Sequence, residues 1–254
     1  MGPRLRGDDE NEPTSTGACS QRWHDNQVVN KASNSMKLYS SAISPYASRV
    51  RIQILHKQLP VQIVPPPGGM GSAEVKAKNP AGKIPVLDMG GQSLAESWAI
   101  MSYLEALHPV PAMLPADAYA AAKLQELVRF TDLYLAPAMF PLFLALRGKA
   151  DDAAVAQALQ NLDAQLQVLE QQLTHRQALN SGLALDLLDA ALLPIIWYAR
   201  VLARHFGVTD CLAALPVSQQ WWQRASKNDA AGAVLAQMQT GLQAAMPALF
   251  AEQE

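Results

Sequence analysis

Residues 79–104, NPAGKIPVLDMGGQSLAESWAIMSYL, contain the pattern from which the fold can be predicted. A short apolar run at 85–87 is followed by the turn sequence MGG at 89–91, and a second strand resumes at 92–94, which predicts a small β-hairpin. Apolar residues then recur at helical spacing, so a helix should follow the hairpin directly. We expect the unpaired N–H groups at the start of this helix to favour a bound carboxylate.

The Ile84-Pro85 step lies at the start of the first predicted strand, where a residue without an N–H is tolerated. A cis bond at this step would turn the main chain of Ile84 outward, leaving its amide and carbonyl free to pair with an extended ligand. Glu96 and Ser97, at the helix start, would provide an anion site nearby. The stretch therefore predicts a site for a short, peptide-like molecule that carries a carboxylate.

Length and charge narrow the class of protein. The chain has 254 residues, half of them hydrophobic, and a net charge of −2, so one or two domains with buried cores are expected. Lysine and arginine are dispersed, which argues against a nucleic-acid partner. The most apolar run that we identify, residues 183–193, is interrupted by Asp186 and Asp189 and is too short to span a membrane. We therefore expect no membrane partner.

Cysteine and histidine usage indicates the compartment and argues against a metal site. Cys19 and Cys211 form neither a disulfide framework nor a CxxC pair, so a reducing, cytoplasmic location is expected. The five histidines are scattered without ligand spacing. We predict no metal centre.

The chain divides into four parts by composition. Residues 1–35 are polar and rich in acidic side chains, which predicts a disordered extension or leader. Residues 36–108 should form an α/β domain of order βαβαββα, too short for a nucleotide-binding doubly wound sheet but sufficient for a thioredoxin-like domain. Residues 109–115 contain three prolines and form a linker. Residues 116–254 are expected to form an all-helical domain.

Several features are predicted within the helical domain. Residues 116–146 should form one long helix with bends at Pro137 and Pro141. A leucine stripe predicts a core seam on the next helix and consists of Leu159, Leu162, Leu166, Leu169 and Leu173.

Asp186 is the expected N-cap of a further helix and Asp189 lies in its first turn, which is the spacing of a capping pair. An acid/base pair is the alternative interpretation of two such carboxylates, and capping is favoured over it.

Ser44 and Pro45 open a predicted helix, and this step has two interpretations. Serine before proline is a common N-cap, worth about 1 kcal/mol. The same hydroxyl, at the positive end of the helix, could also donate a hydrogen bond to an anion beside Pro85. Both roles are compatible, because a hydroxyl accepts through its lone pairs while it donates its hydrogen elsewhere.

Four segments together resemble the cytosolic glutathione S-transferase family: ISPYASRVRI at 43–52, NPAGKIPVL at 79–87, LAES at 94–97 and DLLDAALLP at 186–194. The first segment is similar to serine-type members such as the zeta and tau classes, in which Ser44 would be the catalytic serine. Relatives with a redox function have cysteine at this position. The subclass stays open.

The resemblance implies that glutathione is the co-substrate. Ile84 would pair its main chain with the cysteinyl part of glutathione, and Pro85 would be the cis proline. Glu96 and Ser97 would hold the γ-glutamyl end, and Lys83 would approach the glycyl carboxylate. The implied partners are glutathione and a small hydrophobic electrophile, and the implied assembly is a homodimer.

The electrophile site is expected in the cleft between the two domains. The candidate wall residues are Tyr46, Tyr134, Met139, Phe140 and Trp197. Conjugation of the glutathione thiolate to a small apolar electrophile is the favoured reaction, with a role in detoxification. Glutathione-dependent isomerisation, dehalogenation and ether cleavage are alternatives on the same fold, as is a non-catalytic interaction module.

Overall fold

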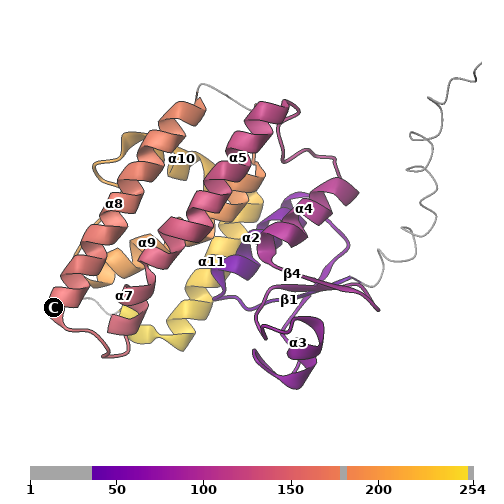
Figure 1. Cartoon of the computed structure of the whole chain (residues 1–254), viewed down its shortest axis with the longest axis horizontal. Coiled ribbons are helices and arrows are strands. Elements are labelled where there is room, and N and C mark those ends of the chain that lie inside the picture. Colours follow the sequence, from indigo (N-terminus) through magenta and orange to yellow (C-terminus); the bar gives the residue numbers. More distant parts are fainter. Residues whose placement is uncertain (1–35, 178–181, 251–254) are drawn as a thin grey trace, which may run out of the picture.

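The computed structural model describes residues 36–177 and 182–250, and the predicted extension at 1–35 lies outside them. The first part of the chain forms one four-stranded sheet of order β2-β1-β3-β4 (Figure 1). β1 and β2 are parallel, whereas the β1/β3 and β3/β4 pairs are antiparallel. The strands are β1 (Lys37–Tyr39), β2 (Gln62–Val64), β3 (Val86–Asp88) and β4 (Ser93–Ala95).

Three helices accompany the sheet: α2 (Pro45–His56), α3 (Ala73–Lys78) and α4 (Ser97–Leu107). The element order is therefore βαβαββα, and the predicted thioredoxin-like domain is confirmed. The predicted hairpin is β3 and β4, with the helix α4 directly after it. The exact boundaries that we predicted between domain, linker and helical region stay predictions.

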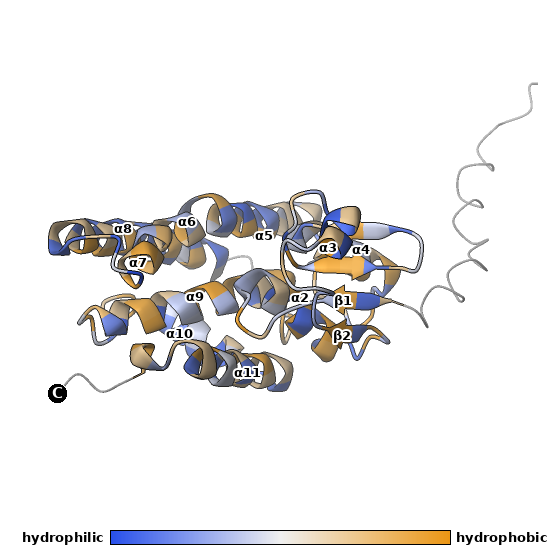
Figure 2. Ribbon diagram, turned by 90° about the horizontal axis from the view of Figure 1, so that it is seen from below, coloured by the Kyte–Doolittle hydropathy of each residue, from blue (hydrophilic) through white to orange (hydrophobic). Residues whose placement is uncertain are grey.

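The rest of the described chain is helical and forms layers beside the sheet domain (Figure 2). Helix α9 lies in the middle layer, between α5 on one side and α11 on the other, and packs against α2. The elements of the helical domain are α5 (Ala118–Phe130), η2 (Thr131–Leu135), α6 (Ala136–Ala138), α7 (Phe140–Ala145), α8 (Asp152–Gln177), α9 (Leu187–His205), α10 (Pro216–Ala225), α11 (Asp229–Ala245) and η3 (Pro247–Leu249).

The single long helix predicted for residues 116–146 is interrupted. Residues Thr131–Leu135 form a π-helical turn before Pro137, and a second break falls at Met139 before Pro141. Each proline lacks the N–H that an α-helix needs at an interior position. The regular series of main-chain hydrogen bonds is therefore interrupted on the N-terminal side of each proline. The two predicted bends are confirmed as interruptions of the helix.

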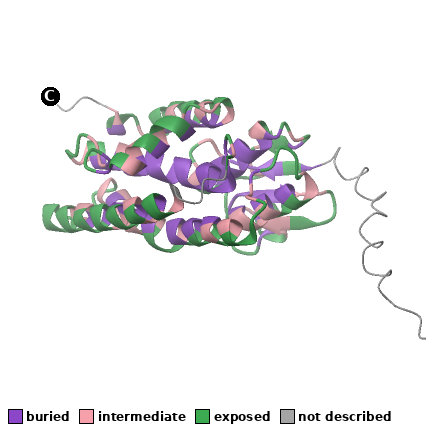
Figure 3. Ribbon diagram, turned by 90° about the horizontal axis from the view of Figure 1, so that it is seen from above, coloured by how far each residue is buried: buried purple, intermediate pink, exposed green. Residues whose placement is uncertain are grey.

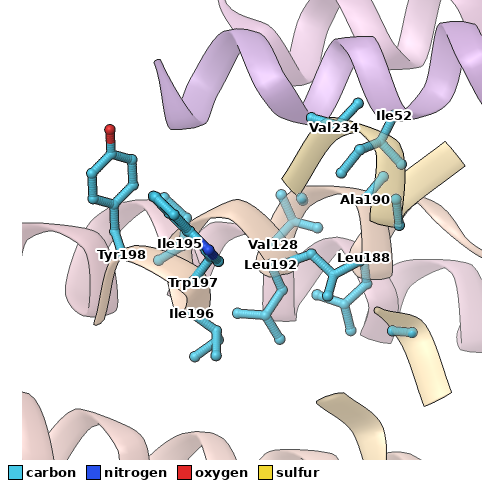
Figure 4. Close-up of a cluster of buried hydrophobic side chains, with 14 of the residues drawn as sticks. Ile52, Val128, Leu188, Ala190, Leu192, Ile195, Ile196, Trp197, Tyr198 and Val234 are labelled. Carbon is cyan, nitrogen blue, oxygen red and sulfur yellow. The ribbon is translucent and has the colours of Figure 1, made fainter. Parts of the chain in front are cut away.

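Apolar side chains of α9 form the centre of the molecule. Buried residues concentrate in the middle of the protein in Figure 3, with exposed residues on the outer helices. The close-up in Figure 4 shows Leu188, Leu192 and Ile195 of α9 in a cluster with Ile52 of α2, Val128 of α5 and Val234 of α11. One core therefore joins the sheet domain to the helical domain. The predicted leucine seam of α8 is confirmed, because its four leucines from Leu162 onward are buried.

The start of α9 has the predicted capping box. The Asp186 carboxylate accepts a hydrogen bond from the Asp189 amide at 2.8 Å, and the Asp189 carboxylate accepts one from the Asp186 amide at 3.2 Å. Asp189 also accepts hydrogen bonds from Trp221 Nε1 at 2.7 Å and from the Arg224 guanidinium at 2.7 and 3.0 Å. These partners satisfy both carboxylates structurally, which confirms capping over acid/base chemistry.

The helical run Ala118–Ala145 bears on the expectation that no segment spans a membrane. By length and composition alone it is apolar enough to cross a membrane, although we expected no such segment. Such a match is weak evidence, because core helices of globular proteins meet the same criterion. Leu124, Leu127 and Val128 of this run are buried against the rest of the protein.

Candidate active site

The register of the sheet brings the predicted site residues to one end of the domain. Tyr39 in β1 pairs with Val86 in β3, and Val86 pairs with Ala95 in β4. The end of β1, the start of β3 and the end of β4 therefore coincide. Ser44 follows β1 and Pro85 precedes β3. The Glu96-Ser97 step follows β4, so all three parts of the predicted site start from the same edge.

Ser44 is the N-cap of α2, as predicted. It is half-buried, its backbone is extended, and its Oγ accepts a hydrogen bond from the Ala47 amide at 3.2 Å. This bond uses a lone pair and leaves the hydroxyl hydrogen able to be donated. The structural role is thus confirmed, while the catalytic role stays a prediction.

The Ile84-Pro85 bond is cis, as predicted, and both residues are buried. In the described part of the chain, the main chain of Ile84 makes no hydrogen bond. An amide and a carbonyl are therefore free to pair with an extended molecule, as in recognition by strand addition. Lys83 beside them is exposed, and its carbonyl accepts a hydrogen bond from Asn79 Nδ2 at 2.9 Å.

Glu96 has an unusual backbone conformation at the start of α4. Its φ is +67° and its ψ is 116°, and its exposed side chain makes no capping bond. Such a conformation costs about 1 to 3 kcal/mol and is typical of functional sites. Ser97, the first residue of α4, is buried, and its Oγ accepts a hydrogen bond from Arg49 at 3.4 Å. The helix start beside Ser97 offers unpaired N–H groups to an anion.

Arg49 is a site residue that the sequence analysis missed. It is fully buried on α2, and its guanidinium forms an ion pair with Asp132 in η2 at 2.7 Å. It also lies over the ring of Tyr46, 4.9 Å from the centroid. Because Arg49 contacts both Ser97 and Asp132, it connects the predicted anion site to the helical domain. No spacing rule marked it, since arginine is usually a surface residue.

An apolar cavity of about 420 Å³ lies between the domains beside the start of α2. This volume is within the usual range of small-molecule sites. Three predicted wall residues lie there: Tyr46, Met139 and Phe140. Burial raises the pKa of Tyr46, so its phenol is protonated at neutral pH. The other lining residues, which sequence analysis missed, are Pro45, Ala136, Pro137, Phe143 and Ile195.

Two predicted wall residues do not line this cavity. Tyr134 is 58% exposed, and its ring stacks on Phe130 with the centroids 5.8 Å apart. Trp197 lines a second cavity on another side of α9. Residues two apart on a helix point in nearly opposite directions, so Ile195 faces the interdomain cavity where Trp197 was expected.

Tyr198 connects α9 to the loop before Ser44. Its hydroxyl donates a hydrogen bond to the carbonyl of Ile43, and its ring packs edge-on against Phe143 of the cavity wall, with centroids 5.5 Å apart. In Figure 4, Tyr198 and Ile196 point to opposite sides of α9. Burial raises the pKa of Tyr198, which keeps the phenol protonated as a donor. The helical domain thus holds the main chain next to Ser44.

A thioredoxin-like sheet domain, a helical domain and an apolar cavity between them define the architecture of glutathione S-transferases. A tau-class glutathione S-transferase from mango, Mangifera indica, has the same fold, with a TM-score of 0.73. The match covers 85% of this chain and all of that one at 23% identity. The family model "Glutathione S-transferase, N-terminal domain" matches residues 38–112.

The chain belongs to the glutathione S-transferase family. It is 33% identical to glutathione S-transferase 3 of Zea mays over 201 residues, which are 74% of this chain and 87% of the maize protein. A glutathione S-transferase of Pseudomonas putida is 34% identical over 39% of the chain. A probable maleylacetoacetate isomerase of Drosophila melanogaster is 38% identical over 36% of the chain. The chain spans only 45% and 42% of these last two relatives.

Proposed function

We propose that the protein is a glutathione transferase that joins the thiolate of glutathione to a small apolar electrophile. The observation that carries this proposal is the register Tyr39–Val86–Ala95, which gathers Ser44, the free main chain of Ile84 and the start of α4 at one sheet end. A tripeptide along Ile84 would find a helix start for one of its carboxylates. The interdomain cavity lies beside Pro45, directly after Ser44.

Each part of glutathione has a candidate partner in this arrangement. The cysteinyl main chain would pair with Ile84, and the γ-glutamyl carboxylate would lie at Glu96 and Ser97. Arg49, whose charge is paired with Asp132, donates a hydrogen bond to Ser97 and so positions this side chain at the γ-glutamyl end. The exposed amine of Lys83 would reach the glycyl carboxylate, and the chain offers it no ion pair among the described residues.

Ser44 would act by stabilising the thiolate rather than as a nucleophile. A thiol has a reference pKa of about 8.5, so it is mostly protonated at neutral pH. A hydrogen bond to a charged group contributes about 1.5 to 3 kcal/mol, which corresponds to about one to two pKa units. The start of α2 adds about 0.3 to 1 kcal/mol in the same direction.

The cavity favours an apolar electrophile over a charged substrate. Its described lining residues are apolar or aromatic and include neither lysine nor arginine. The name of the Drosophila relative indicates an isomerase that acts on an organic acid. The cavity of such an enzyme would need a cation to bind the carboxylate of that substrate. Conjugation is therefore preferred to isomerisation.

The test compares Ser44→Ala with Ser41→Ala, a serine in the same loop. Turnover of glutathione with 1-chloro-2,4-dinitrobenzene is measured from pH 6 to 9, and glutathione affinity by calorimetry. We expect Ser44→Ala to lower kcat about tenfold or more at neutral pH and to move the rate profile to higher pH, with affinity changed little. Ser41→Ala should behave as the parent. Equal activity of Ser44→Ala would refute the role, and glutathione binding without turnover of any electrophile would favour an interaction module.

The proposal extends to assembly and location. A homodimer is supported by large apolar side chains that stay exposed on α4, α5 and η2, namely Tyr103, Tyr119 and Leu133. A cytoplasmic location is supported by Cys211, which is a free thiol as expected in a reducing compartment. A role in detoxification would follow from conjugation of small apolar electrophiles. Light scattering after size exclusion tests the assembly, and a mass of one chain would contradict the dimer.

A further inference from the structure

Helices α2 and α4 are joined by three polar contacts, which recur every four residues along both helices. These contacts are the hydrogen bond from Arg49 to the Ser97 hydroxyl at 3.4 Å, the hydrogen bond from Gln53 to the Met101 carbonyl at 2.9 Å, and the ion pair of Lys57 with Glu105 at 2.8 Å. We call them the polar ladder. Residues four apart lie on one face of a helix, and both series advance in the same direction, so the two helices run parallel along the ladder.

The polar ladder is buried along its whole length. Arg49 and Gln53 are 0% exposed, and so is the side chain of Lys57. Gln53 adds little net stability, because its own Oε1 is buried and has no hydrogen-bond partner among the described residues. An apolar side chain at this position would avoid that cost. Alignment of the two helices therefore explains the buried amide better than stability does.

The polar ladder limits how far α2 can slide along α4. Apolar contacts are non-directional and tolerate small shifts, whereas a hydrogen bond needs its donor and acceptor within about 3.2 Å. A slide of one residue moves one helix along the other by about 1.5 Å, which would break the contacts of the ladder. The contact of Arg49 with Ser97, at 3.4 Å, is already long and weak. The alignment therefore depends on Gln53 and Lys57.

The last contact of the polar ladder is also attached to the segment that links the two domains. Lys57 Nζ donates hydrogen bonds to the carbonyls of His108 and Pro111, and the Glu105 carboxylate accepts one from the Met113 amide at 2.8 Å. Removing one partner of a buried ion pair leaves an unpaired buried charge, so a variant of Lys57 or Glu105 would endanger the fold itself. Gln53 is the position at which the alignment can be tested alone.

We propose that Gln53 and Lys57 are positioning residues, which align the start of α2 with the start of α4 and so hold Ser44 at the correct distance from Ser97. Ser44 is the N-cap of α2 and Ser97 is the first residue of α4. A slide of one helix along the other would change the distance between the donor to the thiolate and the γ-glutamyl end of the site. Catalytic groups need to be held within about 0.5 Å of their working positions. This inference rests on the proposed function, in which both helix starts bind one glutathione molecule.

The test measures the pKa of the bound glutathione thiol from the ultraviolet absorbance of its thiolate, which requires no electrophile. Gln53→Met keeps the length of the side chain and removes the donor to the Met101 carbonyl. Ser218→Ala is the matched control, because Ser218 is also 0% exposed and donates a hydrogen bond to Glu170 at 2.6 Å, on α10. Each variant should lower Tm by about 2 to 4 °C. We expect only Gln53→Met to raise the thiol pKa, by about 0.5 to 1 unit, and to lower kcat/KM at neutral pH about three- to tenfold.

The parent protein tests the proposed function, and the two variants test the positioning role. If the parent does not bind glutathione, or binds it without lowering the thiol pKa, the proposed function and the positioning role are both overturned. If the parent lowers the thiol pKa and Gln53→Met lowers it equally, only the positioning role is overturned. The same conclusion follows if Ser218→Ala raises the thiol pKa as much as Gln53→Met, because the shift would then result from lower stability rather than from lost alignment.

Discussion

Replacing Asp189 with alanine should destabilise the protein strongly, because three groups depend on its buried carboxylate. Asp189 is 1% exposed and accepts hydrogen bonds from the Asp186 amide, Trp221 Nε1 and Arg224. The Asp186 side chain still caps the helix, but the Asp186 amide loses its hydrogen bond to the Asp189 carboxylate, which costs about 1 kcal/mol. The buried indole N–H left unpaired costs about 1 to 3 kcal/mol. Arg224 is 47% exposed and can be hydrated, so the loss of its ion pair with Asp189 adds about 0 to 1 kcal/mol.

The expected decrease in the free energy of unfolding is therefore about 2 to 5 kcal/mol. Urea unfolding followed by circular dichroism measures it. The free energy of unfolding should decrease less in Asp189→Asn, because the amide oxygen of asparagine can still accept a hydrogen bond from Trp221. Asp163→Ala, at an exposed position on α8, should stay within about 0.5 kcal/mol of the parent. A loss below about 1 kcal/mol in Asp189→Ala would refute this account of the helix start.

Two further predictions concern the contact between domains and the free thiol. Tyr198→Phe removes the hydrogen bond to the Ile43 carbonyl and should lower the free energy of unfolding in urea by about 1 kcal/mol. The same variant should lower kcat more than it lowers glutathione affinity. A variant with the kcat and stability of the parent would contradict this prediction. Burial raises the pKa of Cys211 to about 11, so in a Cys19→Ser variant the folded protein should react with iodoacetamide at pH 8 about a hundredfold more slowly than free cysteine. Rapid alkylation of that variant before unfolding would show that Cys211 is not shielded.

Local patterns were sufficient to predict the sheet domain and the sheet-end site. Ser44 before Pro45, and Asp186 three residues before Asp189, are capping patterns whose partners lie within four residues. The hairpin of β3 and β4 likewise depends on a short turn. Such features could be predicted because the interacting atoms are neighbours in the chain.

Contacts between distant segments could not be predicted in this way. Arg49 pairs with Asp132, 83 positions later, and neither residue belongs to a recognisable spacing. The wall of the interdomain cavity depends on which side of α9 faces α2. Ile195 lines this cavity, whereas Trp197, two residues later, lines another one. Hydrophobicity alone does not distinguish them, because both are buried.

The π-helical turn at Thr131–Leu135 has a consequence for sequence length. A π turn holds more residues than an α turn, so the extra residue is absorbed locally and the chain beyond it keeps its orientation. Leu133, in this turn, is exposed, so its removal would vacate no core position. A natural or engineered chain one residue shorter here would therefore replace the π turn by an α turn and still present Met139 and Phe140 to the same cavity.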